Sequence, residues 1–112
     1  MDVRFKSSKL AKLCNSQKER ERAWGERRAK IVGRRLDDLR AAVTLDDMRH
    51  GPGDCHEYRH RQDYILTLDL DGGWRLFFRP SHEPLPLLPD GTSLDWTRVT
   101  EIEITDVRKA HE

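Results

Sequence analysis

The sequence contains few cysteines and no long hydrophobic run. Its 112 residues include two cysteines, Cys14 and Cys55, which do not form a C-x-x-C pair. Neither a disulfide framework nor a thiol redox motif is therefore indicated. The segment 1–14 lacks the apolar core of a signal peptide, and no later stretch approaches the length needed to span a bilayer. These absences favour a soluble, cytoplasmic protein without a membrane partner.

Apolar side chains are also scarce. Hydrophobic residues make up 36% of the chain and charged residues 37%, which places it at the polar end of globular proteins. Three tryptophans and several regularly patterned segments argue against disorder. A chain of this length supports one hydrophobic core. We therefore expect a single domain over residues 1–112 with a thin core.

The net charge of +1 hides an uneven distribution. Residues 1–36 contain twelve Lys/Arg and four Asp/Glu, which gives +8, whereas residues 37–112 contain nine and sixteen, which gives −7. The basic part could meet RNA or an acidic protein, but the acidic part could not meet RNA unaided.

The first third of the chain predicts a strand followed by two helices. Val3 and Phe5 alternate with charged residues over 2–6, and a short helix follows from about Lys9 to Asn15, capped by Ser7 or Ser8. A longer helix begins after the Asn15-Ser16 cap and runs to about Val43.

Two arginines interrupt the apolar face of this longer helix. At 100° per residue, Arg28 and Arg35 fall inside the apolar arc. Either their side chains extend outward or the helix bends near Gly25 or Gly33. The other arginines are interpreted as a solvated face interleaved with glutamates.

The segment Cys55–Arg79 predicts a β-hairpin. Leu66, Leu68 and Leu70 alternate with polar residues, and Asp71-Gly72-Gly73 suits a tight turn. In the second strand Trp74, Leu76 and Phe78 would face a core. Arg75, Phe77 and Arg79 would then lie on an open face suited to a phosphate and a base.

The last third predicts a loop and a final strand. Pro80, Pro84, Pro86 and Pro89 exclude a central strand, and a strand resumes over 99–107. The order β-α-α-β-β-β-β implies an α+β domain in which two N-terminal helices pack on one face of a small, largely antiparallel sheet. The opposite face would be partly open.

The order and spacing of several short motifs resemble a known family. The motifs are C-H-E-Y-R at 55–59, T-L-D-L-D-G-G-W-R-L-F-F at 67–78, the insert H-E-P-L-P-L-L-P-D-G and a penultimate histidine. Over nearly its whole length the chain is similar to HigB-like killer proteins, toxins of the RelE/ParE toxin–antitoxin superfamily. The resemblance implies a RelE-like fold.

The resemblance also implies an activity and its partners. Proteins of this kind are toxins of type II toxin–antitoxin pairs that cut mRNA on the translating ribosome, a metal-independent reaction without a cofactor. The implied partners are a cognate helix-turn-helix antitoxin, the ribosome and mRNA. The family's site positions correspond here to Arg59, Arg75 and His111. The family's tail Asp-Tyr-His reads Lys109-Ala110-His111, so Tyr58, Tyr64 or Phe77 would have to replace the tail aromatic.

RNA cleavage without a metal needs a base, an acid and fixed positive charge. Arg75 and Arg59 can supply the charge, but arginine is a poor base, so proton transfer falls to His111 or His56. The candidate RNA-binding residues are Lys6, Lys9, Lys12, Tyr58, Phe77 and Arg79.

Structural alternatives remain for these residues. Arg75 could simply pair with Asp69 or Glu57, and His111 could be a terminal residue without a role. His50, Cys55, His56 and His60 could be a zinc cluster, although His56 and His60 lie far apart along an extended strand.

A second function class also stays open. The chain could be a non-catalytic binding module of the same superfamily, either a ParE-like inhibitor of its target or a nuclease whose site has decayed. Acidic residues near the hairpin, Asp69 and Asp71, favour this alternative.

Overall fold

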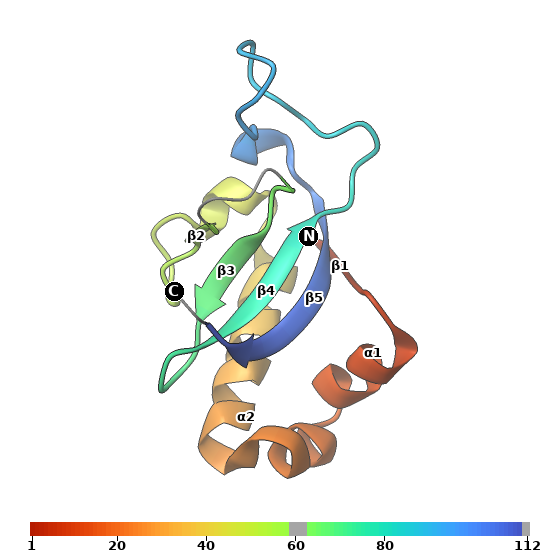
Figure 1. The fold of residues 1–112 in the computed structure, drawn as a ribbon, viewed down its shortest axis with the longest axis vertical. Helices are drawn as coiled ribbons and strands as arrows, with labels where there is room; N and C mark the ends of the chain where they lie inside the picture. The colour runs from red at the N-terminus through yellow and green to blue at the C-terminus, as the bar shows by residue number, and fades with distance from the viewer. Residues whose placement is uncertain (59–62, 111–112) are drawn as a thin grey trace.

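The computed structural model describes residues 1–58 and 63–110. Its elements, in chain order, are β1 (Asp2–Phe5), α1 (Ser8–Asn15), α2 (Gln17–Ala41), the 3₁₀ turn η1 (Leu45–Met48), β2 (His56–Glu57), β3 (Leu66–Asp69), β4 (Trp74–Pro80), the 3₁₀ turn η2 (Trp96–Arg98) and β5 (Glu101–Lys109). The expected α+β class is confirmed, and Figure 1 shows β3 and β4 crossing in front of part of α2.

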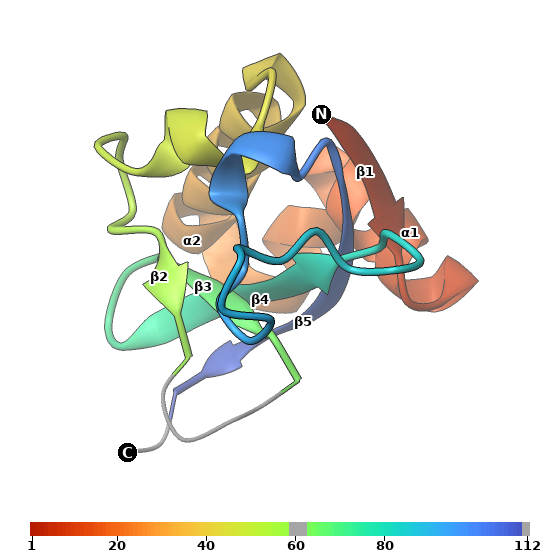
Figure 2. The same ribbon diagram turned by 90° about the horizontal axis from the view of Figure 1, so that it is seen from above.

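The five strands form one mixed sheet in the order β1-β5-β4-β3-β2. The first strand runs parallel to β5, and the other three pairings are antiparallel. Seen from above, α1 and α2 lie on the same side of the sheet (Figure 2). Among the elements of the described residues, no helix lies on the other side of β3, β4 and β5 (Figure 2).

Serine caps start both helices, as the sequence predicts. The Ser7 hydroxyl accepts from the Leu10 amide at 3.1 Å, and the Ser16 hydroxyl accepts from the Glu19 amide at 3.3 Å. Each cap satisfies an amide that has no partner within its own helix. The caps fix the short break between α1 and α2.

The longer helix bends at Gly25. This glycine has φ 81° and ψ 163°, outside the helical region, a backbone that glycine adopts without a Cβ penalty. The bend turns the following part of α2 along the sheet. Of the two positions named from the sequence, Gly33 stays helical.

The two arginines in the apolar arc do not extend into water. Arg28 Nε lies 2.7 Å from Asp71 Oδ1, and the Arg28 guanidinium covers the Trp74 ring at 4.4 Å. Arg35 Nε donates to the Asp69 carbonyl oxygen at 3.0 Å. Both side chains therefore tie α2 to the end of the β3–β4 hairpin. Of the two alternatives that the sequence left open, the bend at Gly25 is the one that the structure has.

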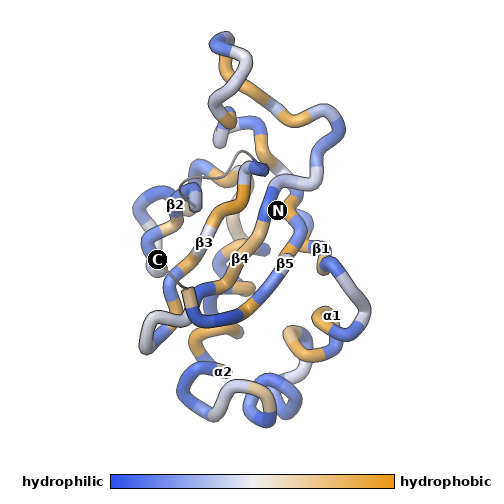
Figure 3. The backbone as a smooth tube through the Cα atoms, in the orientation of Figure 1, coloured by the Kyte–Doolittle hydropathy of each residue, from blue (hydrophilic) through white to orange (hydrophobic). Residues whose placement is uncertain are grey.

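The core lies between α2 and the sheet. Figure 3 shows apolar residues along β3 and β4 and at intervals along α2. The fully or nearly fully buried side chains here include Val32, Leu36, Leu39, Leu66, Leu68, Leu76, Phe78, Ile102 and Ile104. The sheet therefore has one face packed against α2, and its other face carries mainly polar and charged side chains together with Phe77.

The β3–β4 hairpin has the predicted turn. Gly72 and Gly73 have φ 58° and 79°, and the Trp74 amide donates to the Asp71 carbonyl at 3.0 Å. The prediction for Pro80 was wrong in detail, because β4 continues through Pro80 opposite Ile102. This proline is the last residue of its strand, a position where a missing amide is tolerated.

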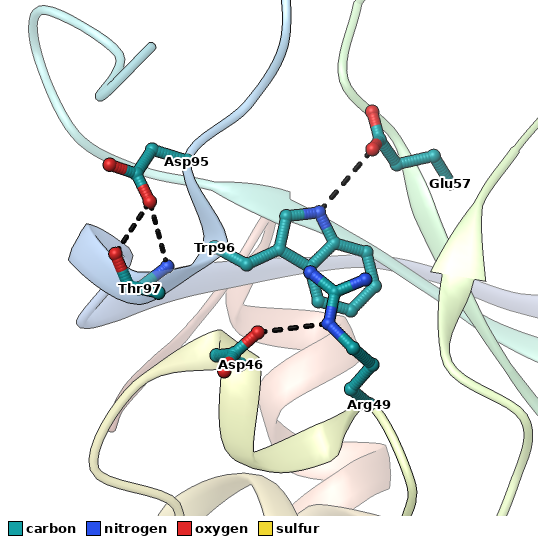
Figure 4. Close-up of polar contacts among 6 residues, drawn as sticks. All are labelled: Asp46, Arg49, Glu57, Asp95, Trp96 and Thr97. Atoms are coloured by element: carbon teal, nitrogen blue, oxygen red, sulfur yellow. Dashed lines mark hydrogen bonds and ion pairs between the residues drawn. The ribbon is translucent and has the colours of Figure 1, made fainter. Parts of the chain in front are cut away.

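Two 3₁₀ turns that the sequence did not indicate close the end of the core beside β2 (Figure 4). The Arg49 guanidinium lies 4.1 Å from the centroid of the Trp96 ring and pairs with Asp46 at 2.9 Å. Trp96 Nε1 donates to Glu57 at 3.3 Å. These contacts join η1, η2 and β2, and they use Glu57 as a structural acceptor.

The proline-rich loop 81–95 is internally bonded. Leu87 and Leu94 form an isolated bridge, and the Arg98 side chain donates to the Leu87 carbonyl at 2.6 Å. The Tyr64 hydroxyl donates to the Thr92 carbonyl at 2.8 Å. Tyr64 thus anchors this loop. Within the described ranges, no helix combines the length and apolar character needed to cross a membrane.

Candidate functional site

The face of the sheet opposite α2 carries most of the residues that the sequence singled out. Residues opposite each other in antiparallel strands point to the same side. One row across this face is therefore Asp69, Arg75 and Arg108, and the next is His56, Thr67, Phe77 and Asp106. We call this surface the open face.

Two arginines stand opposite each other on the open face. Arg75 of β4 pairs in register with Arg108 of β5. Arg75 Nε lies 3.3 Å from Asp69 Oδ1, and Arg108 Nε lies 3.0 Å from Asp106 Oδ2. Like charges directly opposite each other oppose strand pairing, and the two carboxylates offset this repulsion. Of the two partners that the sequence offered for Arg75, Asp69 is the one used.

Arg108 was not among the residues singled out from the sequence. The expected last strand ended at Val107, whereas β5 extends to Lys109. Simple alternation from Ile102 and Ile104 would put Arg108 on the core side. The register shift between Phe77 and Phe78 moves it to the open face, and the sequence gives no sign of that shift.

His56 is oriented by its own turn. Its Nδ1 lies 2.7 Å from the Asp54 carbonyl oxygen. A carbonyl oxygen only accepts, so Nδ1 carries the hydrogen and the neutral ring presents its lone pair at Nε2. The side chain is 39% exposed. The contact of Nδ1 with Asp54 orients the ring and leaves Nε2 as the nitrogen that can meet another group.

Phe77 is more enclosed than the sequence suggested. Its relative exposure is 2%. The Tyr58 ring meets it edge-on with centroids 5.4 Å apart, and the Arg108 guanidinium lies 4.0 Å over its face. The expectation of an aromatic ring open to a base is therefore not met at Phe77 in this conformation, because two neighbours cover it.

Thr67 lies between His56 and Phe77 in the same row. It is completely buried, and its hydroxyl has no hydrogen-bond partner among the described residues. Burying a hydroxyl without a hydrogen bond lowers the stability of the folded state by about 1–3 kcal/mol. Such groups are rare in folded proteins.

A hollow of about 370 Å³ adjoins these rows. It is lined by Lys6, Tyr58, Asp63, Ile65, Phe77, Arg79, Glu103, Thr105, Asp106 and Arg108. Three of these side chains are cations and three are carboxylates, so the formal charge of the lining is zero. Arg79 pairs with Glu103 at 3.4 Å. The hollow thus brings together four of the six candidate RNA-binding residues.

The other two candidates lie elsewhere. Lys9 and Lys12 line a separate depression formed by α1 and the start of α2. Their side chains do not line the hollow on the open face. The structure therefore divides the expected RNA-binding set into two surfaces.

Two candidate catalytic residues, Arg59 and His111, lie outside the described residues. The described chain ends at Ala110, whose amide donates to the Gly73 carbonyl at 3.0 Å. Gly73 stands two residues before Arg75 in the sequence, so β5 leads the chain toward the Arg75 end of the open face.

The cysteines do not resemble metal ligands or nucleophiles. Burial raises the pKa of Cys14 to about 11 and that of Cys55 to about 12. In residues 1–58 and 63–110, no three His, Cys, Asp or Glu side chains gather as a metal site would require. The fourth member of the zinc alternative, His60, falls outside those ranges.

Comparisons with known proteins gave no match. No family model matches the chain, and neither a curated protein nor a solved structure is similar to it. Its functional interpretation therefore depends on the residues of the open face and on the motifs of the sequence.

Proposed function

We propose that this protein is a HigB-like toxin of the RelE/ParE superfamily, a metal-independent endoribonuclease that cuts mRNA on the ribosome and so blocks translation. The observation that carries the proposal is that strand register puts Arg75, Arg108 and His56 on one face of the sheet. A cytoplasmic location and a helix-turn-helix antitoxin partner belong to the same proposal.

The reaction assigns one task to each group. A histidine removes the proton of the ribose 2′-hydroxyl, the 2′-oxygen attacks phosphorus, and the bond to the 5′-oxygen breaks. A second group protonates the departing 5′-oxygen, which leaves a 2′,3′-cyclic phosphate and a 5′-hydroxyl. His56 suits the first task because its Nδ1 is held by Asp54. His111 is our candidate for the second.

Arg75 would stabilise the charge that develops on the phosphate oxygens. A guanidinium remains protonated in essentially all protein settings and binds phosphate oxygens in a fixed fork. Arg75 is 21% exposed and its Nε faces Asp69. A phosphodiester would compete with Asp69 for this guanidinium, so the carboxylate restrains the site until RNA is delivered.

The zero formal charge of the hollow lining is consistent with a nuclease that cuts RNA only on the ribosome. Long-range attraction of RNA depends on the number of phosphates that a protein neutralises. A lining with as many carboxylates as cations gives free RNA little attraction. Delivery of mRNA by the ribosome would replace that attraction with proximity.

The non-catalytic alternative is favoured by the same ion pairs. Arg75, Arg79 and Arg108 each have a carboxylate partner on the open face. A surface whose charges are already satisfied could serve contact with a target protein rather than cleavage of RNA.

Growth of bacteria that express the chain without an antitoxin separates these functions. We expect the wild-type protein to arrest growth and to cause mRNA cleavage in the cells, and we expect Arg75→Ala and His111→Ala to do neither. The matched control is Arg22→Ala, which removes an arginine of α2 that is 67% exposed and pairs with Glu19 on the same helix.

Three outcomes decide the matter. Arrest by the wild type and the control alone supports the nuclease. Equal arrest by all variants, without mRNA cleavage, favours the binding module. No arrest by the folded wild-type protein contradicts the toxin proposal itself.

A further inference from the structure

We propose that the hollow on the open face is a nucleotide-binding site in which a base stacks on the outer surface of the Arg108 guanidinium. The inference deepens the proposed function, on which it rests, because it names the residue that holds a nucleotide of the RNA. It assigns base stacking to Arg108 instead of Phe77, one of the three aromatic residues that the sequence left open for this role.

The first step is the enclosure of Phe77. With 2% exposure and contacts from Tyr58 and Arg108, this ring has no face to offer. It serves instead as a support, since a cation 4.0 Å above its centroid is attracted by the ring electrons. The inner face of Arg108 is thereby fixed.

The second step is the orientation of Arg108. Its Nε lies 3.0 Å from Asp106 Oδ2, which holds the guanidinium from its edge while Phe77 holds it from below. The side chain is nevertheless 42% exposed and lines the hollow. Among the described residues, this guanidinium is supported on one face by Phe77 and is partly exposed to solvent. Such a group can act as a stacking platform, since guanidinium planes bind unstacked bases in this way.

The third step is the space and charge beside that platform. A volume of about 370 Å³ lies within the range of small-molecule sites, roughly 300–1,000 Å³. Lys6 and Arg79 line the same hollow. Arg79 pairs with Glu103 at 3.4 Å, and its side chain is 52% exposed. Such an exposed pair is weak, so Arg79 can exchange its carboxylate for a phosphate.

Nucleoside monophosphates and ribose 5-phosphate provide the test. Two-dimensional NMR titrations of the purified whole chain compare AMP, CMP, GMP and UMP with ribose 5-phosphate, which has the sugar and phosphate but no base. Stacking of one base corresponds to an affinity gain of roughly 5- to 150-fold. We expect at least one nucleotide to bind about tenfold more tightly than ribose 5-phosphate, with shifts at residues of the hollow.

Variants isolate the guanidinium plane. Arg108→Lys keeps the charge and removes the plane, so its nucleotide affinity should fall about tenfold while binding of ribose 5-phosphate is unchanged. Arg22→Lys, which alters an exposed arginine of α2 that does not line the hollow, should bind both as the wild type does. Asp106→Asn, which loosens Arg108 without removing it, should lower nucleotide affinity by a smaller factor.

The results separate this inference from the proposed function. Equal binding of nucleotides and ribose 5-phosphate, wild-type nucleotide affinity in a folded Arg108→Lys protein, or shifts confined to α1 would overturn the stacking site. Nucleotide binding that depends on Arg108 in a protein that fails to cleave mRNA on ribosomes would keep the site and remove the nuclease.

Discussion

At the scale of single residues, several arginines of this polar chain are partly buried and bind oxygen atoms of other elements. Arg28 and Arg35 occupy positions of α2 that helical spacing assigns to the core, and each binds an oxygen of the β3–β4 hairpin end. Charge that would be costly to bury is thus paired at the edge of the core. Arg28 pairs with a carboxylate and Arg35 with a backbone carbonyl. Pairing of an arginine with a carboxylate recurs at Arg75 and Arg108 on the open face.

The Arg28–Asp71 pair makes stability depend on pH. Burial disfavours the charged form of Asp71, but the hydrogen bond and charge of Arg28 outweigh it and hold the pKa of this carboxyl below its ordinary value of 3.8. A carboxyl with a lowered folded-state pKa contributes stability above its unfolded-state pKa, and the contribution disappears as pH falls through the folded-state pKa.

We therefore expect Arg28→Ala to lower the free energy of unfolding by about 1–2 kcal/mol at pH 7, from the lost ion pair and the lost contact with Trp74. Urea denaturation should show this difference shrinking below about pH 4, where Asp71 begins to protonate. The control is Arg27→Ala, whose side chain is 85% exposed and 4.0 Å from Asp71; its effect should stay below about 0.5 kcal/mol. Equal losses in both variants at every pH would contradict this assignment.

The sequence predicted which side chains share a face but not what covers them. Period-two alternation correctly grouped Arg75 with Phe77, because that rule is local to one strand. The enclosure of Phe77 depends on Tyr58 and Arg108, which come from the two ends of the sheet region and reach the ring only through strand register. Register between distant segments is set by tertiary packing, which a single sequence does not display.

At the scale of elements, the helices and the hairpin followed from local signals. Serine caps, helical spacing and a glycine turn are short-range features, and they marked the ends of α1, α2 and β3–β4 to within a few residues. The 3₁₀ turns η1 and η2 were missed, because their closing contact between Arg49 and Trp96 joins segments about half the chain apart. The sequence offered the bend at Gly25 as one of two positions.

The substitution Gly25→Ala tests this bend, because a straight helix and a bent helix predict stability changes of opposite sign. In an unbent helix Gly25→Ala would stabilise by about 0.5–1 kcal/mol, since alanine is the better helix former. At φ 81°, which L-residues rarely adopt, we expect it instead to destabilise by about 1–2 kcal/mol. A new Cβ would meet nothing within 4 Å, so the effect would come from the backbone alone. A rise in the denaturation midpoint would show that α2 is continuous.

At the scale of the whole molecule, the charges of the two parts of the chain nearly cancel. The excess of +8 in residues 1–36 resides mainly on the helices, and the −7 of residues 37–112 includes the carboxylates of the open face. The side that would meet RNA is therefore the side with the less positive sequence. We interpret this arrangement as a site that acts on RNA already held by another particle.

The measurement that tests this account most directly is cleavage of a defined mRNA by purified protein, with and without programmed ribosomes. We expect cleavage with ribosomes, little or none without them, and a loss of about a hundredfold or more for a folded Arg75→Ala variant. Cleavage of free RNA at the same rate, or an Arg75→Ala protein as active as the wild type, would contradict the proposed site.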